Sequence, residues 1–159
     1  MIRAAVEEDR QAIWTMLEPL VRTGEVFALP LDMRCDDGMA YWFAPGNHVF
    51  VCELDGLVAG SYYLRPNQRG GGSHVGNCGY MTAPWAAGRG VAGEMCAHSV
   101  SFAKMAGFRA LQFNFVVSTN HAAVHLWAKH GFRVVGRLPG AFAHPQEGFV
   151  DALVMWLDL

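Results

Sequence analysis

The chain has 159 residues, of which 52% are hydrophobic and 16% are charged, so we expect one folded domain over residues 1–159 and no disordered segment. Its net charge of −2 excludes a strongly basic surface for nucleic acid, and no apolar run is long enough to cross a membrane. The acidic start has no signal-peptide pattern, and the four scattered cysteines lack a Cys-x-x-Cys pair. These features predict a cytoplasmic protein with free thiols.

In the first half of the chain, apolar periodicity predicts two helices and then a hairpin. The expected elements are a strand at residues 2–6, a helix from the acidic residues 7–9 to Gly24, a helix at about 32–42, and strands at 48–54 and 57–64. Asp55-Gly56 joins the last two strands, and Asp-Gly between apolar runs is a strong hairpin signal. Pro19 lacks an amide hydrogen and is expected to end or kink the first helix early.

In the second half, strands and helices alternate. The expected elements are strands at 74–81, 111–117, 132–138 and 149–157, and helices at about 91–107 and 118–131. Val91, Met95, Phe102 and Ala106 form the apolar stripe of the first of these helices. The loop at 66–73 either lies near a substrate mouth or is a plain connector. The overall order predicts an α/β domain with a mixed sheet.

The stretch from Met81 to Gly93 runs from a strand through a proline turn and a glycine-rich bend into a helix. Gly88, Gly90 and Gly93 leave the backbone uncovered, so a ligand can approach the amides. The first N–H groups of the helix that starts near Val91 have no intrahelical partner and lie at the positive end of its dipole. The bend therefore suits a phosphate or pyrophosphate, although a tight turn that needs glycine only for its geometry gives the same pattern.

From Tyr80 onward the sequence resembles the GNAT acyl-CoA-dependent N-acetyltransferases. Members of that family carry Gln/Arg-x-x-Gly-x-Gly/Ala at the strand-to-helix turn, where this chain has Ala87-Gly-Arg-Gly-Val-Ala92. The family's Asn-x-x-Ala helix start, Leu-Tyr pair and Gly-Phe correspond to Asn120-His-Ala-Ala123, Leu126-Trp127 and Gly131-Phe132. The resemblance implies a single GNAT-type α/β domain: a mixed, mostly antiparallel sheet of about seven strands, flanked by about four helices and splayed at the acyl-CoA site.

The resemblance also implies that acetyl-CoA is the co-substrate and that no metal is needed. The pyrophosphate should rest on the amides of the glycine-rich bend, and the pantetheine should lie between the strand that ends at Met81 and the strand that begins at Leu111. An acceptor amine should enter from the opposite side and attack the thioester directly. The residues expected to contact acetyl-CoA are Met81, Ala83, Gly88, Arg89, Gly90, Val91, Ala92, Gly93, Asn120 and Trp127.

Two residues depart from the family pattern. Ala87 stands where the family has Gln or Arg, which removes one side-chain contact but leaves the backbone amides in place. Trp127 replaces the tyrosine that often protonates the leaving thiolate, and an indole N–H is not a usable acid. A thiolate leaves readily near neutral pH because the reference pKa of a thiol is about 8.5. We therefore predict that Trp127 shapes the pocket; the alternative is a tryptophan that only fills the core.

A closer resemblance is to the yeast proline-analogue (azetidine-2-carboxylate) N-acetyltransferases. The segments that carry it are residues 74–79, 113–114, 119–120, 136–137 and 150–153. In that subfamily, asparagines that match Asn77, Asn114 and Asn120 are implicated in substrate binding or catalysis. By this resemblance, Asn77 and Asn114 bind the acceptor, and Asn114 and Asn120 take part in catalysis. Alternatively, these carboxamides satisfy backbone groups where the sheet opens.

The general base is less evident, because no acidic residue lies between His74 and Met81. An ordered water held by Asn120 is the first choice for deprotonating the amine. His74 titrates in a suitable range, but it is expected on the face opposite Asn77 and is as consistent with a structural role. His121 and His125 share a helix face but lack a third ligand, so no metal site is predicted. No cysteine has the surroundings of a nucleophile.

The leading hypothesis is therefore an N-acetyltransferase that acts on a small-molecule amine, such as an amino acid or a proline analogue. The alternatives are a non-catalytic domain that binds and senses acyl-CoA, and a protein or peptide N-acetyltransferase. A homodimer through the apolar C-terminal strands is consistent with the sequence, and no nucleic-acid or membrane partner is expected.

Overall fold

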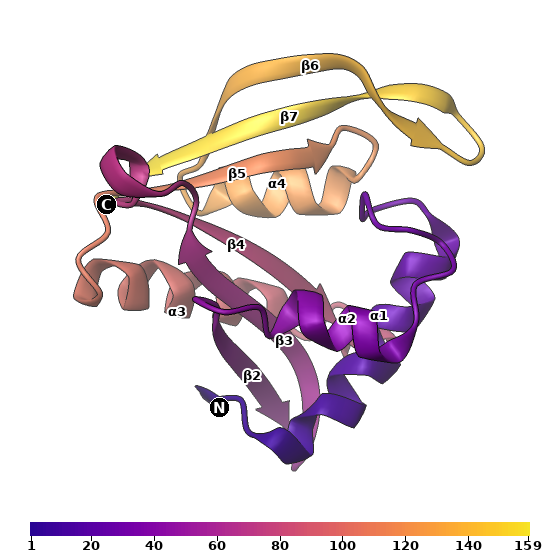
Figure 1. Ribbon diagram of the computed structural model, residues 1–159, viewed down its shortest axis with the longest axis vertical. Coiled ribbons are helices and arrows are strands. Elements are labelled where there is room, and N and C mark those ends of the chain that lie inside the picture. Colours follow the sequence, from indigo (N-terminus) through magenta and orange to yellow (C-terminus); the bar gives the residue numbers. More distant parts are fainter.

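The computed structural model describes all 159 residues, and it contains one seven-stranded sheet in the order β1-β2-β3-β4-β5-β7-β6 (Figure 1). All neighbouring strands are antiparallel except β4 and β5. The strands are β1 (Ile2–Ala4), β2 (His48–Leu54), β3 (Leu57–Pro66), β4 (Val75–Thr82), β5 (Ala110–Val117), β6 (Arg133–His144) and β7 (Gly148–Asp158). The helices are α1 (Arg10–Thr23), α2 (Cys35–Trp42), α3 (Val91–Met105) and α4 (His121–Lys129). The predicted fold class is confirmed.

The helices cover both faces of the sheet, and the alternation of side chains along β3 shows which helix packs where. Ser61 and Tyr63 face α2, where the indole of Trp42 donates to the Ser61 hydroxyl at 3.0 Å. Tyr62, the residue between them, points to the other face, where its hydroxyl is hydrogen-bonded to Nδ1 of His98 in α3 at 2.6 Å. Trp127 of α4 packs on Tyr80 of β4, on the same face as α3. None of the helices combines the length and apolar character needed to cross a lipid bilayer.

The sheet opens between its two parallel strands. β4 and β5 pair only at Val75 with Ala110 and at Gly76 with Leu111, and beyond these positions they diverge (Figure 1). β5 also has an irregularity between Phe113 and Val116 where it pairs with β7. The resulting gap exposes the backbone of both strands, so the predicted splay is confirmed.

Glycines mark several of the predicted boundaries correctly. Gly24 ends α1 with a φ of +66°, and its N–H donates to the Val21 carbonyl at 3.2 Å. Asp55 and Gly56 both have positive φ, at +54° and +77°, which is the backbone of the tight hairpin turn predicted there. Gly131, at +92°, follows the end of α4. Local turn chemistry therefore explains where these elements stop.

The prediction that Pro19 ends the first helix early is wrong, because α1 continues to Thr23. Pro19 and Thr15 both lie on the exposed face, so water can satisfy the Thr15 carbonyl that loses its partner. On the opposite face Ile13, Leu17 and Val21 are completely buried, and this burial holds the helix together across the proline.

Three smaller boundaries also differ from the predictions. α2 begins at Cys35, three residues after the expected start at Asp32. Ala106 lies beyond the end of α3 and is exposed, so it does not belong to the buried stripe. β6 does not stop at Leu138: it passes through Pro139 and Gly140 as an irregular segment and pairs with β7 again from Phe142. An edge strand tolerates proline because one row of its N–H groups has no partner strand.

Candidate functional site

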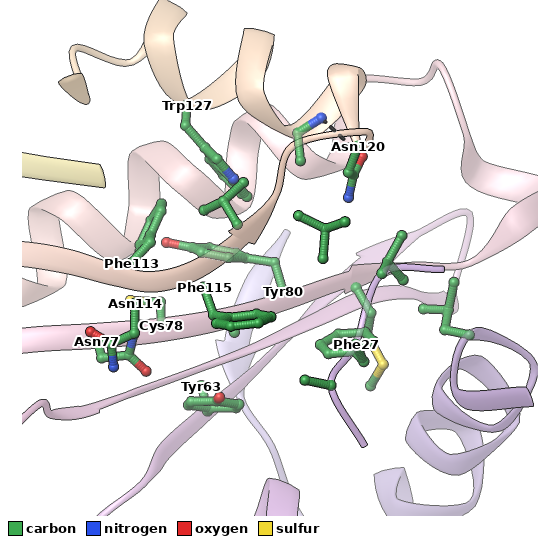
Figure 2. Close-up of a pocket in the computed structure, with 18 of the residues that line it drawn as sticks. Phe27, Tyr63, Asn77, Cys78, Tyr80, Phe113, Asn114, Phe115, Asn120 and Trp127 are labelled. Carbon is green, nitrogen blue, oxygen red and sulfur yellow. Dashed lines mark hydrogen bonds between the residues drawn. The ribbon is translucent and has the colours of Figure 1, made fainter. Parts of the chain in front are cut away.

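A cavity of about 600 Å³ occupies the gap between the diverging ends of β4 and β5. Its walls come from β3, β4, β5, α4 and the segment at residues 26–29, with one residue each from α1, α2 and α3: Leu20, Tyr41 and Ala92. Figure 2 shows Trp127 and Asn120 on one side of the cavity and Tyr63 and Phe27 on the other. The cavity therefore reaches from the face covered by α4 to the face covered by α2, and two reactants can enter it from opposite sides.

The glycine-rich bend forms a row of free backbone donors at the start of α3. Gly88 and Gly90 have φ values of +75° and +83°, and an added Cβ at either would meet no atom within 4 Å. Several amides here donate to no main-chain carbonyl, and the positive end of the helix dipole adds to their attraction for an anion. The residues with free amides are Gly88, Gly90, Val91, Ala92 and Gly93. The bend has the groups that a phosphate needs.

The other residues near the bend that were predicted to contact acetyl-CoA differ in their surroundings. Arg89 bonds to the Asp55 carboxylate at 2.9 Å across an exposed surface, so this guanidinium must share or exchange a partner to reach a phosphate. Ala83 is buried outside the cavity, and its N–H donates to the Ala59 carbonyl at 2.8 Å. Met81 and Ala92 do line the cavity, and Ala92 joins it to the start of α3.

Trp127 lines the cavity and also belongs to its aromatic wall. Its ring lies 4.7 Å from that of Tyr80 and 5.1 Å from that of Phe113, between ring centroids. The residue is 8% exposed. Trp127 thus both packs in the core and faces the cavity. The position is consistent with a tryptophan that shapes the pocket and with one that fills the core.

Asn120 caps α4, as predicted. Its Oδ1 accepts from the Ala123 amide at 3.3 Å, and its carboxamide lies at the cavity (Figure 2). Since Oδ1 is used by the cap, the Nδ2 hydrogens remain for a ligand or a water molecule.

Asn77 and Asn114 belong to one hydrogen-bonded chain that crosses the opening of the sheet. The Asn77 Nδ2 donates to the Gln112 carbonyl at 2.9 Å, just beyond the last backbone pair of β4 and β5. The Gln112 side chain donates to Asn114 at 2.9 Å, and Asn114 donates to Asn67 at 2.6 Å. Asn77 therefore satisfies opened backbone, and both asparagines line the cavity as well. The structure brings them together with Asn120 and Trp127 around one space.

An aromatic wall on the side of α2 was not predicted from the sequence. Tyr63 and Tyr41 join through their hydroxyls at 3.1 Å, and a Cβ at Gly79 would lie 2.5 Å from the Tyr63 ring. The absent side chain at Gly79 thus lets this ring cover β4. The period-two pattern of β3 is the one signal that could have placed Tyr63 and Arg65 on a common face, but the partner of that face is not local in the sequence.

The ionisable groups of the cavity are few. Burial raises the pKa of the Cys78 thiol to about 12, so it is protonated at neutral pH and is a poor nucleophile. Burial also raises the pKa of the Tyr80 hydroxyl, which bonds to Ser99 at 2.7 Å. No Asp, Glu, His or Lys lines the cavity. His74 lies elsewhere, in a separate depression beside Arg109 and Asp158, which removes it as a candidate base.

Comparisons with known proteins agree with this geometry. Residues 7–132 match the model of the acetyltransferase (GNAT) family. N-acetyltransferase aca1 of Schizosaccharomyces pombe is 32% identical over 103 residues, which are 61% of this chain and 47% of that protein. This chain thus spans about half the length of that relative.

Two solved structures share the whole fold. A GCN5-related N-acetyltransferase from Kribbella flavida is 38% identical with a TM-score of 0.94, over 100% of this chain and 97% of that one. The yncA protein of Salmonella typhimurium, solved with its cofactor acetyl-CoA, is 22% identical with a TM-score of 0.87, over 100% and 93% of the two chains. The latter likeness is one of fold alone.

Proposed function

The chain belongs to the acetyltransferase (GNAT) family, and we propose that it transfers the acetyl group of acetyl-CoA directly to the amine of a small molecule. The observation that carries this proposal is the meeting of two features. A row of free amides, suited to the pyrophosphate, leads at Ala92 into a largely apolar cavity between two diverging strands. A CoA thioester has this same combination of an anionic end and a long, uncharged arm.

Acetyl-CoA fits the residues that are present. The free amides of Gly88 and of residues 90–93 would hold the pyrophosphate, with the Arg89 side chain beside them. The exposed edges of β4 and β5 would pair with the pantetheine, and Met81, Asn120 and Trp127 would surround it. When bound, acetyl-CoA supplies an activated acetyl group and a thiolate leaving group.

The acceptor would enter from the side of α2, facing Tyr63, Asn77 and Asn114. Its amine must be neutral to attack the thioester carbon, and no side chain of the cavity is a base of suitable pKa. The proton therefore passes to water, which the Asn120 Nδ2 can hold by a hydrogen bond. We expect the rate to follow the ionisation of the acceptor amine and to show no separate protein pKa between pH 6 and 8.

We propose further that the acceptor is an amino acid or a proline analogue, on the basis of the subfamily resemblance of Asn77, Asn114 and Asn120. The test is the release of CoA from acetyl-CoA against proline analogues, amino acids, polyamines and short peptides. Turnover with small amino acids supports the proposal. For each asparagine, an Asn→Ala variant with unchanged kcat/KM would remove that residue from the site.

A second candidate is a domain that binds acyl-CoA without chemistry, favoured by the lack of a base and by Trp127 in place of tyrosine. Tight acetyl-CoA binding without CoA release for any acceptor would favour this candidate. Turnover restricted to peptides would favour a protein acetyltransferase.

We also propose that the protein is cytoplasmic and forms a homodimer through β6 and β7. The proposed dimer is supported by apolar side chains that β6 and β7 leave exposed: Val134, Val135, Leu138 and Phe149. Sedimentation of a Phe149→Glu variant beside the unchanged protein tests the dimer, because a buried carboxylate at the interface would dissociate it.

A further inference from the structure

The cavity contains a single side chain that is charged at neutral pH. Most of its 25 lining residues are hydrophobic, and the only ionised side chain among them is that of Arg65 at the end of β3. With no carboxylate to balance it, this guanidinium makes the acceptor side of the cavity positive. A site of this charge disfavours polycationic acceptors and favours an amine that also carries a negative group.

The Arg65 guanidinium forms no hydrogen bond or ion pair within the protein, although the residue is partly buried. Arginines elsewhere, such as Arg89 and Arg137, bond to aspartates at 2.9 and 2.7 Å. Arg65 forms no such ion pair, so the planar set of donors on its guanidinium remains available for a ligand.

The guanidinium is nevertheless held in place. Its Cζ lies 5.2 Å from the centroid of the Tyr63 ring, within the range of a cation–π contact. Tyr63 is 4% exposed, its hydroxyl bonds to the Tyr41 hydroxyl at 3.1 Å, and its ring packs edge-on against Trp42 with 5.0 Å between ring centroids. A cation fixed on a rigid aromatic wall binds a ligand at a lower entropic cost than a mobile surface arginine.

We propose that Arg65 binds the carboxylate of the acceptor and thereby sets the specificity of the site for amino or imino acids. This inference rests on the proposed acetyltransferase function. In the β3–β4 register Arg65 lies opposite Asn77, which also lines the cavity and uses its Nδ2 for the Gln112 carbonyl. The Asn77 Oδ1 remains as an acceptor for the amine of the same ligand. Neighbouring groups thus match both ends of an α-amino acid.

The test measures kcat/KM by CoA release for proline, prolinamide and pyrrolidine, with the unchanged protein and with Arg65→Gln and Arg65→Lys. We expect the unchanged protein to prefer the acid, and Arg65→Gln to lower the ratio of proline to prolinamide by about 10- to 100-fold, as for the loss of a charge-assisted hydrogen bond. The acceptors differ in the basicity of their amines, but this difference affects the ratio equally in the unchanged protein and in the variant. It therefore cancels when the two ratios are compared. Arg65→Lys should restore part of the ratio, since it keeps the charge but not the planar fork.

Arg69→Gln is the matched control, because Arg69 is exposed and does not line the cavity, and it should leave the ratio unchanged. Thermal unfolding of each variant separates a folding defect from a loss of specificity. The inference is overturned if the unchanged protein acetylates prolinamide and pyrrolidine, which lack a carboxylate, as well as it acetylates proline. It is also overturned if Arg65→Gln lowers kcat/KM for proline and prolinamide equally. If no amine is acetylated at all, the proposed function itself fails.

Discussion

Substitution of Gly90 tests whether the glycine-rich bend binds the pyrophosphate, because the effect on stability can be separated from the effect on binding. Its φ of +83° lies in the left-handed region, and an added Cβ would meet no atom within 4 Å. Alanine at this position should therefore lower the free energy of unfolding only by its conformational cost, about 1–2 kcal/mol. In a domain of this size, such a loss corresponds to a drop in Tm of roughly 2–8 °C.

The same methyl group should interfere with a bound pyrophosphate. If Gly90→Ala prevents one charge-assisted N–H contact, worth about 1.5–3 kcal/mol, the Kd for acetyl-CoA rises about 10- to 100-fold. Gly46 is the matched control: its φ is +90°, its Cβ direction is equally open, and it lies in the turn between α2 and β2. Gly46→Ala should lose similar stability and keep its affinity.

Calorimetric titration with acetyl-CoA and thermal unfolding, each for both variants, measure the two quantities. Equal stability losses with equal, unchanged affinities would refute the assignment of the pyrophosphate to these amides. A Gly90→Ala variant that is unfolded would be replaced by Gly90→Asn, since asparagine tolerates the left-handed region better.

Three other variants test parts of the site, and a fourth tests an ion pair that stabilises the fold. Arg89→Ala should raise the Kd for acetyl-CoA about 3- to 10-fold and flatten its salt dependence, whereas Arg133→Ala, which also breaks an exposed pair, should not. Neither variant should lose much stability, because exposed ion pairs contribute little. Trp127→Phe should reduce kcat by less than about tenfold, and a loss of several orders of magnitude would mean that the indole has a chemical role. Cys78→Ser should retain turnover, and intact-protein mass spectrometry should detect no acetyl-enzyme, because burial raises the pKa of this thiol to about 12. The hydrogen bond from Arg3 lowers the pKa of Asp9, so Asp9 stabilises the fold above its unfolded pKa of about 4, and this contribution is lost as the pH falls through the lowered value. Asp9→Asn should therefore weaken the dependence of Tm on pH below about pH 4.

The sequence by itself determined the order of the elements and most of their ends. The periodicity of apolar residues and the preferences of turn residues are local properties of the sequence. They located a hairpin at Asp55-Gly56 and helix ends at Gly24 and Gly131 without any knowledge of the fold. The glycine-rich bend also predicted free amides, because the first turn of any helix lacks intrahelical acceptors. Pro19 misled the same reasoning, since the burial of the opposite helix face outweighed one lost hydrogen bond.

The tertiary structure alone decided what faces the acceptor. Arg65 and Tyr63 come from β3, Tyr41 from α2 and Phe27 from the loop before it. Their positions in the sequence form no pattern that predicts a common cavity. The sequence left Asn77 open between binding the acceptor and satisfying opened backbone, and only the structure shows its bond to the Gln112 carbonyl, which exists where β4 and β5 part. Local patterns report what each segment does with its own backbone. Specificity arises between segments that are distant in the chain, and only the packing of the sheet brings those segments together.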